Sequence, residues 1–183
     1  MNRRRLPGAW KFRRRPPKSV WVVLLLVALA SLRGFGLWPG RHAPPSPPQL
    51  REAAYRVERV VDGDTIIVLD GDKRVRVRLL GIDTPETVKE GTPVQPWGPE
   101  ATAFTEAFLA GGQAYLRLDR RRVDRYGRAL AYVFVDEVML NEELVRAGLA
   151  RADPYTGDSA AMTRRLYKAQ DEAKAAGRGV WSE

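Results

Sequence analysis

The residues best suited to chemistry lie in two acidic turns and on the strand between them. Asp64 closes an Asp-Gly-Asp turn, and Asp83 opens an Asp-Thr-Pro-Glu turn. Arg78 lies between these turns, on a run in which arginines alternate with apolar residues. Because side chains alternate along a strand, the arginines of this run share one face. Acids and a guanidinium that converge at strand ends predict a metal ion beside a phosphate.

Each acid has its own expected role. We expect Asp64 and Asp83 to meet at one corner of a barrel, with Asp83 at the end of the third strand. A hard cation prefers carboxylate and carbonyl oxygens, so these two side chains and the backbone carbonyl of Thr84 could hold it. A shared cation also allows two neighbouring carboxylates to stay ionised. Glu86, three residues after Asp83, could take a proton from a water molecule or orient that water.

Two arginines are candidates for binding the phosphate. Attack of water on a phosphodiester builds negative charge on the phosphate oxygens, and a guanidinium offers them two aligned donors. Arg78 leads toward Asp83, and Arg128 begins a later strand after an Asp-Arg-Tyr-Gly turn. Tyr126, in that turn, could stack on the substrate or form a hydrogen bond with it.

Composition excludes several other chemistries. The sequence contains no cysteine, and its one histidine, His42, lies in a proline-rich stretch. Thiolate zinc sites, cysteine nucleophiles, histidine metal sites and a Ser-His-Asp triad are therefore excluded. The metals that remain are oxygen-ligated hard cations, calcium or magnesium.

The formal net charge of +9 is unevenly distributed. Residues 1–50 hold 10 of the 31 basic residues and none of the acidic ones. Residues 51–183 therefore hold 21 basic and 22 acidic residues, a net charge of −1. The basic excess belongs to the N-terminal segment, so any nucleic-acid binding by the folded part must come from a local cluster.

The N-terminal region divides into three segments before the predicted domain. Residues 1–19 are basic, and residues 20–38 are mostly apolar. The apolar segment is either an uncleaved membrane anchor or a signal peptide with an Ala-Leu-Ala cleavage sequence at 28–30. Residues 39–50 are rich in proline and predict a stiff linker. We expect a folded domain at 51–183, held outside the cytoplasm.

The domain is predicted to be α+β and rich in strands. Alternating apolar and polar residues indicate five strands, at 55–61, 65–69, 73–80, 114–118 and 129–135. Apolar residues at helical spacing, with Pro or Gly at the ends, indicate three helices, at 99–110, 139–147 and 159–176. Short strands joined by hairpins, followed by helices, predict a Greek-key barrel with three helices packed on it.

The segment from about residue 55 to residue 183 resembles the staphylococcal nuclease-like (thermonuclease) family. The matching segments occur in the same order along the chain, at 61–65, 78–80, 82–86, 97–101, 124–133, 140–150 and 179–183. So many segments in order form a far more specific signal than the Asp-Gly-Asp turn alone. The resemblance implies a five-stranded OB-fold barrel and a nuclease that uses calcium to cleave DNA and RNA, leaving 3′-phosphates.

The resemblance also implies roles for individual residues. The residues that the resemblance implies would hold calcium are Asp64, Asp83 and, through its carbonyl, Thr84. Those implied to act on the phosphodiester are Arg78 and Arg128, which would bind the phosphate, and Glu86, the candidate base. Tyr126 and Tyr155 are the expected substrate-binding residues. The sequence departs from the family pattern in the loop at 87–96 and at 153–155, where Tyr155 is the one aromatic residue.

We therefore expect a calcium-dependent endonuclease of low sequence specificity that acts as a monomer. It would contact DNA or RNA through phosphate and the membrane through its N-terminal segment. The alternative is an OB-fold module that binds nucleic acid or a protein without catalysis. A nuclease assay with calcium and with a chelator separates these hypotheses.

Overall fold

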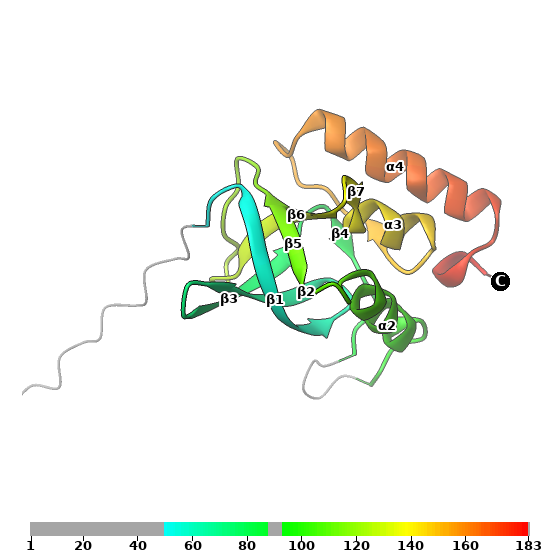
Figure 1. Ribbon diagram of the computed structural model, residues 1–183. Coiled ribbons are helices and arrows are strands. Elements are labelled where there is room, and N and C mark those ends of the chain that lie inside the picture. Colours follow the sequence, from blue (N-terminus) through cyan, green and yellow to red (C-terminus); the bar gives the residue numbers. More distant parts are fainter. Residues whose placement is uncertain (1–49, 88–92, 183) are drawn as a thin grey trace, which may run out of the picture. The chain divides into compact units, whose positions relative to one another are not determined.

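The computed structural model describes residues 50–87 and 93–182 (Figure 1). The predicted basic segment, apolar segment and most of the linker lie outside the described residues, as does part of the 87–96 loop. Within the described ranges, no helix is both long and apolar enough to cross a membrane.

Three antiparallel strands begin the domain: β1 (Ala53–Asp62), β2 (Thr65–Asp70) and β3 (Lys73–Leu79). Their positions agree with the predicted strands to within one or two residues. In β3 the valines and leucine point into the core, while Arg74 and Arg76 are exposed. The alternation of apolar and basic residues in the sequence therefore corresponds to a strand with one buried face and one exposed face.

The barrel closes through β5 (Gln113–Arg117) and β6 (Ala129–Val135). The strand order is β3-β2-β1-β5-β6, and β6 also pairs in parallel with β3. This closed five-stranded arrangement confirms the predicted OB-fold barrel. A sixth strand, β7 (Val138–Met139), pairs with β6 and was not predicted.

The domain has the three predicted α-helices: α2 (Gly98–Phe108), α3 (Leu140–Arg146) and α4 (Ala160–Ala175). Helices α2 and α3 pack against barrel strands β1 and β6, whereas α4 packs mainly on α3. Figure 1 shows α3 and α4 side by side, with the short 3-10 helix η1 (Gly179–Trp181) beyond the end of α4. The predicted apolar face of α4, which includes Met162 and Leu166, is buried.

One expectation about the third strand is wrong. The sequence predicted a strand over 73–80 with Asp83 at its end, but β3 ends at Leu79. Gly81 has a φ of 75°, which turns the chain, and Asp83 lies in a separate strand, β4 (Ile82–Asp83). That strand pairs with β8 (Arg151–Ala152), which the sequence did not predict. Pairing to a segment far along the chain therefore decides where Asp83 lies.

Buried Asn141 fixes the start of this turn. Its Nδ2 atom donates to the carbonyl of Leu80 at 2.9 Å, and its Oδ1 atom accepts the amide of Val133 at 2.9 Å. The side chain has no exposed surface. One amide thus joins the residue after β3 to strand β6 and satisfies two buried backbone groups.

Candidate active site

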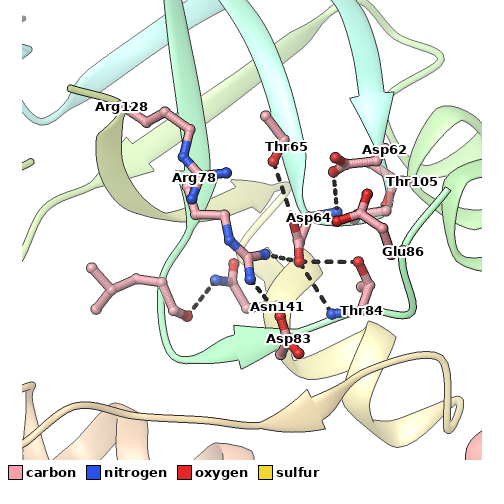
Figure 2. A network of polar contacts seen from close by, with 12 residues as sticks. Asp62, Asp64, Thr65, Arg78, Asp83, Thr84, Glu86, Thr105, Arg128 and Asn141 are labelled. Atoms are coloured by element: carbon pink, nitrogen blue, oxygen red, sulfur yellow. Dashed lines mark hydrogen bonds and ion pairs between the residues drawn. The ribbon is translucent and has the colours of Figure 1, made fainter. Parts of the chain in front are cut away.

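Arg78 joins two acids from different turns. Its Nη2 atom donates to Oδ1 of Asp83 at 2.8 Å, and its Nη1 atom forms an ion pair with Oδ2 of Asp64. Figure 2 shows Arg78, Asp64, Asp83 and Thr84 pointing toward one another. We call these four residues the acidic corner. The predicted convergence of Asp64 and Asp83 is therefore present, with a guanidinium between the two carboxylates.

Asp64 is held from several sides. Its Oδ2 atom accepts the backbone amide of Thr84 at 3.1 Å and the Thr84 hydroxyl at 3.0 Å. Its Oδ1 atom accepts the hydroxyl of Thr65 at 3.0 Å. Its own amide donates to Oδ1 of Asp62 at 3.2 Å. Three of these hydrogen bonds and the ion pair with Arg78 reach the carboxylate, so its orientation is fixed before any ligand binds.

Strand register and close packing explain why these side chains meet. Thr65 of β2 lies opposite Arg78 of β3, so the Asp-Gly-Asp turn ends beside the guanidinium. Helix α2 packs directly on the turn, because a β-carbon at Gly63 would lie 2.7 Å from that of Ala101. The hydroxyl of Thr105 on α2 also donates to the carbonyl of Gly63 at 2.7 Å. The turn therefore needs glycine for steric reasons.

Glu86 is positioned by Gln95. The amide of Glu86 donates to Oε1 of Gln95 at 3.0 Å, and the amide of Gln95 donates to the carbonyl of Glu86 at 2.9 Å. This pair of hydrogen bonds joins the second acidic turn to the chain that leads into α2. Glu86 therefore lies at the edge of the acidic corner on a braced backbone.

Arg128 is held by Asp124, which sequence reasoning gave no role. Its Nε atom donates to Oδ2 of Asp124 at 2.6 Å. The Oδ1 atom of Asp124 accepts the amides of Tyr126 at 2.8 Å and Arg128 at 3.0 Å. Burial raises the pKa of Asp124, but the hydrogen bonds from Arg128 and from these amides outweigh it, so the pKa lies below its ordinary value.

The two predicted substrate-binding tyrosines are both exposed, and both contact arginines. The ring of Tyr126 lies 4.8 Å from the guanidinium of Arg125 and 5.5 Å from that of Arg128. One face of Tyr155 is covered by Arg121, whose guanidinium lies 3.5 Å from the ring centre. Arg121 belongs to a run of three arginines at 120–122, and its contact with an aromatic ring is visible only in the fold.

The predicted site residues line two adjoining hollows. The central hollow has a volume of about 200 Å³, and the predicted residues in it are Asp64, Arg78, Asp83, Thr84, Glu86 and Arg128. The tyrosine hollow has a volume of about 520 Å³ and shares Arg78, Asp83 and Arg128 with the first. Tyr126 and Tyr155 line this second hollow. All eight residues therefore surround one continuous region.

Residues 76–183 match the family described as "Staphylococcal nuclease homologue". The chain belongs to this family. The thermonuclease of Staphylococcus hyicus is 46% identical over 131 residues, which cover 72% of this chain and 77% of the relative. That of Staphylococcus intermedius is 44% identical over 132 residues, covering 72% and 78%. The endonuclease YncB of Bacillus subtilis (strain 168) is 36% identical over 141 residues, covering 76% and 67%.

Membership of the staphylococcal nuclease family makes the chain a nuclease, an enzyme that hydrolyses phosphodiester bonds. Asp62 of this nuclease lines the central hollow, although the sequence gave it no role. Burial raises the pKa of Asp62 above its ordinary value, and Thr65 and the charge of Arg78 only partly offset this. Burial also lowers the pKa of Arg78, although Asp83 opposes the shift. Asp62 is the other acid of the Asp-Gly-Asp turn, and its position two residues before Asp64 was the signal that could have identified it as a site residue.

The donor atoms of the acidic corner suit a hard cation. Asp64, Asp83 and the Thr84 carbonyl offer only oxygen, which calcium and magnesium prefer. Over residues 50–87 and 93–182, however, no three histidine, cysteine or acidic side chains are grouped so as to hold a metal. Arg78 supplies the positive charge between the two carboxylates. A cation would therefore share these acids with Arg78.

Proposed function

We propose that this nuclease is a calcium-dependent endonuclease that cleaves DNA and RNA with little preference for base sequence and leaves 3′-phosphates. The observation that carries the proposal is the acidic corner. Two carboxylates and a guanidinium from separate turns converge in a hollow that Glu86 and Arg128 also line. With Asp62, six ionisable side chains line this small hollow, and few structural roles would require so many.

Each charged residue has a distinct task in this proposal. Arg78 and Arg128 bind the oxygens of the scissile phosphate and neutralise the charge that builds up during attack. Glu86 accepts a proton from the attacking water or orients it. Asp124 keeps Arg128 aimed at the hollow, because it binds the Nε atom and leaves the two terminal nitrogens for phosphate.

Calcium is the proposed cofactor. Asp64, Asp83 and the Thr84 carbonyl would hold it, and their oxygen-only donor set supports this choice. When bound, the cation would polarise the phosphate and lower the pKa of a bound water. Because it would share Asp64 and Asp83 with Arg78, the guanidinium would be freer to bind phosphate.

Loose substrate choice follows from the kind of contact available. Arginines that bind phosphate carry no information about base sequence. Tyr126 and Tyr155 can stack on any base, because every base has an aromatic face. We therefore expect both DNA and RNA to be substrates, with single strands preferred.

The test compares the full chain with three variants on single-stranded DNA and RNA. We expect hydrolysis with calcium and none with a chelator. Asp64→Ala, Arg78→Ala and Arg128→Ala should each reduce hydrolysis by about a hundredfold or more. Arg164→Ala, which removes an exposed arginine of α4, is the matched control and should leave the rate unchanged.

The outcomes separate this proposal from its alternative. Full hydrolysis by all three variants, with circular dichroism showing folded protein, would dispose of the assigned roles. Binding of nucleic acid without cleavage, both with calcium and with chelator, would select the non-catalytic OB-fold module.

We also propose that the nuclease domain, at residues 51–183, acts outside the cytoplasm as a monomer. The support is the order of segments in the sequence, with a basic tract at 1–19, an apolar segment at 20–38 and a proline-rich linker at 39–50. Such an order is typical of a signal peptide or an N-terminal anchor. The mass of the mature chain tests the location, because cleavage after residue 30 would remove residues 1–30, including most of the apolar segment.

A further inference from the structure

A third hollow adjoins the acidic corner and has no role in the proposed function. It has a volume of about 390 Å³ and shares Asp83 and Thr84 with the central hollow. Trp97, Arg151 and Val180 belong to its other walls. We call it the tryptophan hollow.

The three hollows differ in the size of group that they can hold. Sites for drug-sized molecules span about 300–1,000 Å³. The central hollow, at about 200 Å³, suits a phosphate group, whereas the tyrosine and tryptophan hollows, at about 520 and 390 Å³, can each take a nucleoside. Asp83 lines all three. A phosphate at the centre would therefore have a nucleoside-sized space on either hand.

Trp97 is an exposed aromatic residue held in a fixed place. It precedes helix α2 with a φ of 71°, and 37% of its surface is exposed. Such a φ is unfavourable for any residue with a β-carbon, so the surroundings must impose it. Gly98 allows the start of α2 to pack closely on the second acidic turn, because a β-carbon there would lie 2.6 Å from Thr87 and 3.1 Å from the carbonyl of Pro85. The backbone of Trp97 is thus held beside the second acidic turn, and its side chain lines the tryptophan hollow.

Gln95 links this wall of the hollow to the proposed catalytic base. It forms two backbone-directed hydrogen bonds with Glu86, at 2.9 and 3.0 Å, and its carbonyl accepts the amide of Gly98 at 3.1 Å. The chain that carries Trp97 and the chain that carries Glu86 are therefore braced against each other. A group bound against Trp97 would be positioned relative to Glu86.

Arg151 supplies positive charge to the same hollow. It lies opposite Asp83 in the pairing of β4 with β8. Its guanidinium lies 4.2 Å from the ring centre of Trp181, and within the described residues it makes no ion pair with a carboxylate. The arginine is therefore oriented by an aromatic ring, and its charge remains available. An aromatic platform beside a cation is how proteins bind single-stranded nucleic acid.

We propose that the tryptophan hollow binds a second nucleotide of the substrate, across the scissile phosphate from the nucleotide in the tyrosine hollow. The base stacks on Trp97, and Arg151 binds the next phosphate of the strand. The inference rests on the proposed endonuclease function, because an internal phosphodiester has a nucleoside on each side. Continuity of the hollow with the acidic corner makes a substrate strand its occupant.

The test compares two substrates that differ only at this second nucleotide. One is a dinucleotide, and the other is a nucleoside phosphate whose phosphate carries a methyl ester in place of the second nucleoside. Both the 5′- and the 3′-phosphate methyl esters are used, so that either strand direction is covered. We expect Trp97→Ala to lower kcat/KM for the dinucleotide about tenfold, as for loss of a stacking contact, and to leave the methyl ester within twofold.

Several variants separate binding from structure. Trp97→Phe keeps an aromatic face and should recover most of the activity on the dinucleotide. Arg151→Ala should lower kcat/KM for substrates that carry a further phosphate and leave kcat/KM for the methyl esters unchanged. Tyr167→Ala, which removes an exposed aromatic residue of α4, should leave both substrates unchanged. Equal losses on both substrates, or no loss on either, would overturn the inference.

Failure of catalysis and failure of this subsite give different results. If the wild-type chain hydrolyses neither substrate, the proposed function fails. Calorimetric binding of a dinucleotide with methylene in place of the scissile bridging oxygen then tests the hollow without turnover. Weaker binding of that dinucleotide by Trp97→Ala, with binding of a mononucleotide unchanged, supports the subsite. Equal binding by wild type and variant contradicts it.

Discussion

The guanidinium of Arg78 lies against the carboxylate of Asp83, with 2.8 Å between Nη2 and Oδ1. The other terminal nitrogen, Nη1, pairs with Asp64, so one arginine neutralises two acids that a cation would also need. The side chains of Arg78 and Asp64 are 16% and 8% exposed, whereas that of Asp83 is 63% exposed. The inner ion pair is therefore the costlier one to break.

Arg78→Ala should make stability depend more strongly on calcium. In chelator, loss of the guanidinium leaves Asp64 buried without a counter-charge, and we expect the free energy of unfolding to fall by about 3 kcal/mol. A bound cation would replace the lost charge, so calcium should stabilise the variant more than the wild type. Denaturant unfolding with and without calcium measures both. Calcium that stabilises the wild type at least as strongly as the variant would contradict the shared-acid interpretation.

Asp124→Asn should lower stability only above the pH range where the carboxyl titrates. The pKa of Asp124 is depressed in the folded state by Arg128 and by backbone amides. The carboxylate therefore contributes stability above its unfolded pKa, and this contribution is lost as the pH falls through the folded pKa. We expect the variant to be less stable by about 1 kcal/mol at pH 7, with the difference vanishing in acid. Asp72→Asn, in the exposed turn between β2 and β3, is the control. A pH-independent difference would exclude the ionised carboxylate as its cause.

Arg121→Ala should change substrate binding rather than turnover. Its guanidinium lies on Tyr155 and lines the tyrosine hollow but not the central hollow. Removal of this charge should raise KM severalfold, leave kcat unchanged and weaken the salt dependence of binding. Steady-state kinetics on single-stranded DNA at two salt concentrations measures these effects. Arg120→Ala, an exposed neighbour, provides the comparison, and an equal change in both variants would argue against a specific role for Arg121.

Asn141→Ala should destabilise the barrel by about 2–3 kcal/mol. The buried amide satisfies the carbonyl of Leu80 and the amide of Val133, and the variant would leave both unpaired. Urea unfolding measures the change. Thr102→Ala removes a hydroxyl bonded within helix α2 and should cost far less. If the two variants proved equally stable, the side chain of Asn141 would not be what links the end of β3 to β6.

Local patterns in the sequence were enough to predict the five barrel strands and three helices. The alternation of β3, the Asp-Gly hairpin after β2 and the apolar face of α4 each involve residues within a few positions of one another. The closeness of Asp64 and Arg78 was also predictable, because the Asp-Gly-Asp turn leads into β2 and Arg78 lies on β3, which pairs with β2. Short-range periodicity and turn chemistry decide such features before the chain closes.

The sequence by itself therefore determined the five barrel strands, the three α-helices, the family and the side chains available for chemistry. Only the tertiary structure decided that Asp83 lies in a separate strand, that Arg121 covers Tyr155, and that Trp97 and Arg151 line a third hollow. Each of these depends on contacts between distant segments, such as the pairing of Asp83 with Arg151. Such contacts form only when the barrel and helices pack together, and residue spacing along the chain carries no signal for them.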